Sequence, residues 1–85
     1  MKKCYILEMR SICATSGSAE HEHTFDVFPT LVKAQEAMQE RARKRLYNLP
    51  GWEKVFECET KIKLECESHF FDKHVTWTIF EGNAD

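Results

Sequence analysis

The sequence predicts an α+β fold with the element order ββαββ, in which a four-stranded antiparallel sheet carries one helix packed on one of its faces. Three observations lead to this prediction. Apolar residues recur every three or four positions over residues 31–46, as on an amphipathic helix. Two apolar segments, 3–9 and 24–28, precede this helix. A long alternation of apolar and polar residues follows it.

Size and charge limit the possible functions. The 85 residues have room for one domain, so we expect residues 1–85 to form a single small α+β domain. Hydrophobic residues make up 42% and charged residues 31%, a balance that favours a folded globular protein. The net charge of −2 means that binding to a nucleic acid or an anionic membrane would need a local basic patch.

The sequence contains no segment that predicts secretion or membrane insertion. No apolar run approaches the roughly 20 residues of a membrane helix. The apolar run near the N-terminus is broken by Glu8 and Arg10, which argues against a signal peptide. We therefore expect a soluble, cytoplasmic protein without a membrane partner, and its four cysteines should be reduced thiols.

The N-terminal half predicts two strands and the helix. Residues 3–9 carry apolar side chains on both faces, which indicates an interior strand. Residues 14–22 have no hydrophobic period and predict a long hairpin loop, and residues 24–28 then form a short strand. Thr30 should cap the helix. Its buried stripe should consist of Leu31, Ala34, Met38, Ala42 and Leu46.

Residues 52–70 are predicted to form one long strand. Even positions are mostly apolar and odd positions mostly charged, which is the period of a half-buried strand. A two-residue turn at Glu59-Thr60 would pair Cys58 with Lys61, an apolar residue with a charged one, so the register argues against a hairpin there. The even positions expected to face the helix are Phe56, Cys58, Thr60, Ile62, Leu64, Cys66, Ser68 and Phe70.

A second turn is predicted at Asp72-Lys73. This loop pairs Phe70 with Val75 and places Val75, Trp77 and Ile79 on the helix side. The same register turns Phe71 and Phe80 outward. The dipeptide contains neither Gly nor Asn, so a longer loop is the alternative.

Several kinds of chemistry are not expected. Cys58, Cys66, His69 and His74 have a zinc-like spacing, but a single strand would hold the two cysteines roughly 26 Å apart, too far to share a metal ion. We expect both thiols to act as small core hydrophobes and predict no metal site and no cofactor. His69 and His74 fall on the outer face, where the sequence does not decide whether they hold an ion. No nucleophile elbow or glycine-rich phosphate loop is present, so an enzyme is not predicted.

The sequence favours a non-enzymatic protein interaction or regulatory module. Exposed aromatic residues on the outer sheet face would form the contact with a protein partner or a second copy, as in a homodimer. The residues expected at this interface are Phe71, Phe80, Val55, His69 and His74. The layout resembles, in general terms, small α+β proteins of bacteria and their mobile elements. This resemblance implies a bacterial source, and no motif points to one family.

Nucleic-acid binding is the alternative function. It would use the basic end of the helix, which is flanked by Tyr47 and Trp52. The helix dipole also favours cations at a helix C-terminus, typically by about 0.3 to 1 kcal/mol, so a basic cluster there has a structural explanation too. The candidate residues are Arg41, Arg43, Lys44 and Arg45.

Overall fold

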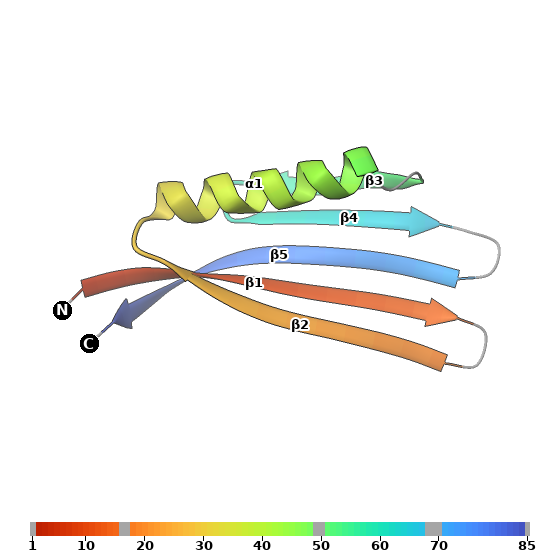
Figure 1. Ribbon diagram of the computed structural model, residues 1–85, viewed down its shortest axis with the longest axis horizontal. Helices are drawn as coiled ribbons and strands as arrows, with labels where there is room; N and C mark the ends of the chain where they lie inside the picture. The colour runs from red at the N-terminus through yellow and green to blue at the C-terminus, as the bar shows by residue number, and fades with distance from the viewer. Residues whose placement is uncertain (1, 16–17, 49–50, 68–70, 85) are drawn as a thin grey trace.

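The computed structural model places one helix on a five-stranded antiparallel sheet. It describes residues 2–15, 18–48, 51–67 and 71–84, and the side chains at 14–20, 67–72 and 84 lie outside this description. The elements are β1 (Lys2–Thr15), β2 (Ser18–Phe28), α1 (Leu31–Asn48), β3 (Trp52–Cys58), β4 (Lys61–Glu67) and β5 (Phe71–Ala84). The strand order is β2-β1-β5-β4-β3, and α1 lies along one face (Figure 1). The predicted α+β class is confirmed, whereas the prediction of four strands is wrong.

The fifth strand arises because the segment predicted as one strand is a hairpin. β3 and β4 reverse at Glu59-Thr60, and Cys58 pairs with Lys61, the pairing that the alternation argued against. That pairing is tolerated because both side chains are exposed. The turn is also anchored on two sides: Ile79 N–H donates to the Thr60 carbonyl (2.8 Å), and Gln35 Nε2 donates to the Glu59 carbonyl (3.1 Å).

A β-bulge at Val55 explains why apolar and polar residues still alternate across the hairpin. The register of the hairpin shifts between Lys54 and Phe56, so Val55 is the inserted residue. On its N-terminal side Trp52 pairs with Cys66 and reaches the helix side, where it packs against the core. On its C-terminal side Phe56 pairs with Lys63 and is exposed, so the prediction that Phe56 is buried is wrong.

The register between β4 and β5 differs from the predicted one without changing the faces. Val75 pairs with Leu64 instead of Phe70, a shift of six residues, and the connection is longer than Asp72-Lys73. Because the shift is even, the side chains of β5 from Val75 onward keep their predicted faces. Val75, Trp77 and Ile79 are buried on the helix side as predicted, and Phe80 points outward.

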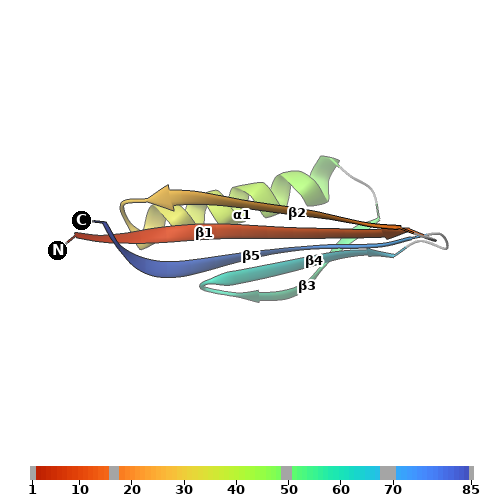
Figure 2. The same cartoon turned by 90° about the horizontal axis from the view of Figure 1, so that it is seen from below.

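β1 and β2 are longer than predicted. The expected loop over 14–22 is wrong: β1 continues to Thr15, and β2 begins at Ser18, its pairing partner. β1 pairs with β5 along its length and with β2 from Tyr5 onward, which satisfies its backbone groups on both edges there without a hydrophobic period. Both views show these strand ends extending beyond the C-terminal end of α1 (Figures 1 and 2). The prediction that β1 is an interior strand is confirmed.

The main hydrophobic core lies between α1 and the sheet. Thr30 caps the helix as predicted, with its Oγ1 accepting a hydrogen bond from Lys33 N–H at 3.2 Å. The predicted stripe is confirmed, with its three central residues buried and Leu31 and Leu46 partly buried. The buried cluster consists of Leu7, Ala34, Met38, Ala42, Ile62, Leu64, Val75, Trp77 and Ile79. No element among the described residues covers the opposite face of the sheet (Figure 2).

Candidate functional site: the outer face of the sheet

The outer face, turned away from α1, carries an exposed group of apolar side chains. Ile6 of β1 pairs with Val27 of β2 on one side and with Phe80 of β5 on the other. Phe25 lies one step further along β2 on the same face. Val27, Phe25 and Phe80 are 66%, 58% and 46% exposed. We call Ile6, Phe25, Val27 and Phe80 the apolar patch.

The start of the helix determines which side of β2 faces outward. Phe28, three residues before α1 begins, pairs with Tyr5, and both pack against the core on the helix side. Because strand side chains alternate, Val27 and Phe25 must then face outward. The position of Phe28 just before the helix is visible in the sequence. It did not settle the faces of β2, because β2 was predicted as a short strand and β1 is apolar on both faces.

Gly82 keeps one border of the patch flat. It pairs with Cys4, and a Cβ atom at Gly82 would lie 3.3 Å from both Cys4 Sγ and Ile6 Cδ1. The side chains of Cys4 and Ile6 therefore occupy the space that a larger residue on β5 would need. A flat apolar surface next to Phe80 is the result.

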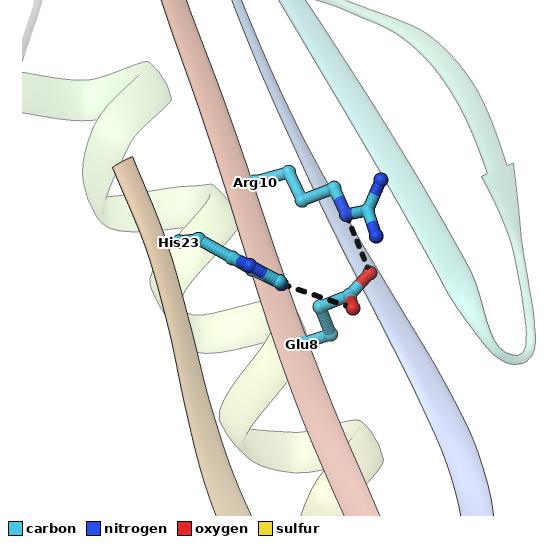
Figure 3. Close-up of polar contacts among 3 residues, drawn as sticks. All are labelled: Glu8, Arg10 and His23. Carbon is cyan, nitrogen blue, oxygen red and sulfur yellow. Dashed lines mark hydrogen bonds and ion pairs between the residues drawn. The ribbon is translucent and has the colours of Figure 1, made fainter. Parts of the chain in front are cut away.

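A polar cluster adjoins the patch. Arg10 Nε donates to Glu8 Oε1 (3.1 Å), and His23 Nε2 donates to Glu8 Oε2 (3.0 Å), so that two strands hold one carboxylate (Figure 3). Glu8 is buried; the Arg10 guanidinium compensates its charge, and His23 provides a hydrogen bond to its second oxygen. The His23 ring also lies 4.5 Å from the Phe25 ring, centroid to centroid, which joins the cluster to the apolar patch.

Other charges on this face are paired too. Lys63 Nζ lies 3.4 Å from Glu65 Oε1 on β4. Together with the pair of Arg10 and Glu8, this contact means that four charged side chains of the outer face are paired within that face. A partner would therefore meet a surface with little net charge. Charges on the partner would then contribute little to the choice of partner.

Only one of the predicted interface residues belongs to the patch. Phe80 does, whereas Val55 lies at the bulge on edge strand β3, and His74 lies between Ile12 and Glu65 on the same face. Phe71 pairs with Thr15 through the backbone, but its side chain lies outside the description, as does the whole of His69. The site is thus centred on β2, β1 and β5.

The hairpin also changes the interpretation of the cysteines. Cys58 is exposed beside the turn, so its predicted core position is wrong, while Cys66 is partly buried opposite Trp52. The two lie at opposite ends of the hairpin, about 17 Å apart along β4. Within the described ranges, no three His, Cys, Asp or Glu side chains come together as a metal-binding group.

We expect Cys58 to become reactive at lower pH in the folded chain than in the unfolded chain. A hydrogen bond from the backbone N–H of Thr60 to the thiolate lowers the pKa of Cys58 below its ordinary value of 9.0. Iodoacetamide labelling across pH, read by peptide mass spectrometry with and without urea, measures this. Buried Cys4 is the control that should stay unlabelled in the folded protein. Identical pH midpoints with and without urea would contradict the prediction.

The basic residues at the end of α1 separate into two groups. Arg41, Lys44 and Arg45 line one groove on the helix side of the sheet. Arg43 lies apart from them, beside Glu36 and Glu40 on the exposed side of the helix. Three of the four candidate nucleic-acid residues therefore line one groove, and the fourth does not.

Comparison with protein-family models, with curated proteins and with solved structures finds no match for this chain. Among the described residues, α1 is the only helix, and it is not apolar enough to cross a membrane.

Proposed function

We propose that this protein is a non-enzymatic interaction module that associates with a second copy of itself through the outer face of its sheet. The observation that carries the proposal is the apolar patch, which is exposed on a face that no described element covers. Contiguous apolar surface of this kind is typical of interaction sites. Burial of one large apolar side chain contributes about 1.5 to 3 kcal/mol.

The dimensions of the face suit a dimer. The molecule measures 49 × 25 × 18 Å along its principal axes, so its broad face offers roughly 1,000 Å², compared with about 800 Å² per partner in a standard interface. Two sheets can pack face to face about 10 Å apart with their side chains interdigitated. The flat border at Gly82 favours such a contact, because no side chain rises there to hold the sheets apart.

The charge pattern favours a second copy as the partner. An apolar patch beside internally paired charges is complementary to itself, because neither copy requires an opposite charge from the other. In a two-fold contact, Ile6, Val27 and Phe80 of one chain would meet the same residues of its partner. The polar cluster at Glu8 would then fix the relative position of the two copies at the border of the apolar contact.

Sedimentation equilibrium over a range of protein concentrations tests this proposal. The wild-type chain should be a reversible dimer, and Val27→Glu should weaken the dimer by about tenfold, because a carboxylate at the interface must be desolvated or displaced. Val32→Glu is the matched control: Val32 is 60% exposed on α1, away from the outer face. A wild-type chain that stays monomeric at every concentration, or equal effects of the two variants, would count against the proposal.

A further inference from the structure

The second surface with functional features lies on the helix side of the sheet, opposite the apolar patch. A groove of about 470 Å³ runs between the C-terminal half of α1 and the strands beneath it. Its volume falls within the range of small-molecule sites. The lining residues are Met9, Thr24, Arg41, Lys44, Arg45, Asn48 and Trp77. Three cations, two polar side chains and an apolar floor thus meet in one place.

Arg45 is the central cation of this groove. Its guanidinium carbon lies 5.1 Å from the centroid of the Trp52 ring and 5.9 Å from that of Trp77. A cation over an aromatic ring is held without donating a hydrogen bond to it, so the N–H donors of Arg45 stay available for an oxyanion. Among the described residues, no carboxylate lies within ion-pair distance of Arg45. Two tryptophan rings therefore hold a cation in position without neutralising it.

The other two cations flank Arg45 and are partly compensated. Arg41 Nη1 pairs with Asp26 Oδ2 at 2.5 Å, and Lys44 Nζ pairs with Glu40 Oε1 at 3.3 Å. The pair of Lys44 and Glu40 is exposed, and such pairs contribute little to stability. Lys44 can therefore exchange its partner for a ligand, whereas Arg41, which also lines the groove, is held by its shorter contact with Asp26.

These observations favour a small anion over a nucleic acid strand. A strand needs cations spaced along its backbone, but only three gather here, Arg43 lies elsewhere, and the chain is acidic overall. A single anionic group matches one uncompensated guanidinium. The apolar floor of Met9 and Trp77 suits a flat organic body, and Thr24 and Asn48 supply hydrogen-bonding groups beside it.

We propose that the groove between α1 and the sheet binds a small planar organic anion, an aromatic or heteroaromatic body with one phosphate or carboxylate group. The anionic group binds the in-plane N–H donors of Arg45, with Lys44 as the second cation. The planar body rests on Met9 and the edge of Trp77. This site is independent of the outer face, because the two lie on opposite sides of the sheet.

Titration of the ¹⁵N-labelled full-length chain with adenosine 5′-monophosphate, followed by NMR, tests the proposal. The indole N–H signal of Trp77 and the amide signal of Thr24 should shift and saturate. Arg45→Gln should raise the dissociation constant by about tenfold or more, because it removes charge-assisted hydrogen bonds to the anion. Inorganic phosphate and uncharged adenosine should each bind more weakly than the nucleotide, because phosphate lacks the planar body and adenosine lacks the anionic group.

Arg43→Gln is the matched control, because it makes the same change two residues away and outside the groove. It should alter the dissociation constant by less than about twofold. Lys44→Gln is a second variant that spares the core, since its exposed side chain makes no core contact, and it should weaken binding by about threefold or more. It keeps the test decisive if Arg45→Gln unfolds the chain.

Three results would overturn this inference. The first is the absence of saturable shifts at Trp77 and Thr24. The second is an equal loss of affinity in Arg43→Gln and Arg45→Gln, which would indicate diffuse attraction to positive charge. The third is much tighter, steeply salt-dependent binding of a single-stranded oligonucleotide than of the mononucleotide, which would identify a nucleic acid strand as the ligand. A Val27→Glu chain that dimerises more weakly but binds the nucleotide as tightly as the wild type would separate this site from the dimer contact.

Discussion

Leu64→Ala is expected to lower the free energy of unfolding by about 2 to 5 kcal/mol, whereas Phe56→Ala on the same hairpin should lower it by less than about 1 kcal/mol. Leu64 is 0% exposed beneath α1, so its truncation leaves a cavity. Phe56 is 48% exposed on the outer face, and its ring loses fewer contacts on truncation. Urea denaturation of both variants measures the difference.

The comparison is best made in a Phe80→Glu background, which is expected to weaken the proposed dimer and so to remove any contribution of Phe56 to a dimer contact. The losses of unfolding free energy in Leu64→Ala and Phe56→Ala distinguish the hairpin from a single long strand. In one uninterrupted strand, Phe56 and Leu64 would both face the helix, and both truncations would be severe. Equal and large losses would therefore contradict the bulge at Val55 and the faces assigned to β3.

Phe80→Glu is expected to raise the dissociation constant of the dimer by about a hundredfold or more. Phe80 lies on β5, the central strand of the sheet, so a carboxylate at this position cannot easily turn away from the contact to reach water. Isothermal dilution calorimetry, with sedimentation equilibrium as a second method, measures this change. Circular dichroism should show an intact fold, because Phe80 lies outside the buried core.

Phe56→Glu provides the control for position on the outer face. Phe56 and Phe80 have similar exposed fractions, 48% and 46%, and both point away from α1. Phe56 lies on edge strand β3, outside the apolar patch, and rim positions tolerate charge better than the centre of an interface. Its substitution should weaken the dimer by less than about fivefold. A larger effect from Phe56→Glu than from Phe80→Glu would mean that the contact is centred near β3 instead of on the apolar patch, and would contradict the proposal.

The sequence predicted the elements whose pattern one local rule determines. The apolar stripe of α1 and its Thr30 cap follow from the period of a helix and the free N–H groups at its start. β1 was recognised as interior because it is apolar on both faces. The faces of β5 were correct although the register was six residues off, since an even shift preserves the alternation.

The hairpin of β3 and β4 could not be predicted from alternation alone. A two-residue turn reverses which positions share a face, and the extra residue at Val55 reverses them again in the first half of β3. These two changes leave the period of two nearly uninterrupted in the sequence. The contacts that hold the turn come from Ile79 and Gln35, which are distant in sequence and carry no local signal.

The candidate site was predicted only in part for a related reason. Phe80 was identified from its place in β5, but Phe25 and Val27 depend on how β2 pairs with β1. The basic end of α1 was visible in the sequence, yet its division into a groove and a separate Arg43 depends on which strands pass beneath the helix. Both features result from the pairing of distant segments.

The most direct test of the self-association is an isotope-filtered NOE experiment on a mixture of ¹³C-labelled and unlabelled chains. Only contacts between two different chains give signals in this measurement. The proposed dimer predicts NOEs from the methyl groups of Ile6 and Val27 of one chain to the rings of Phe25 and Phe80 of its partner. Intermolecular NOEs confined to the backbone of edge strand β2, or none at all at concentrations where the chain is dimeric, would contradict a contact through the outer face.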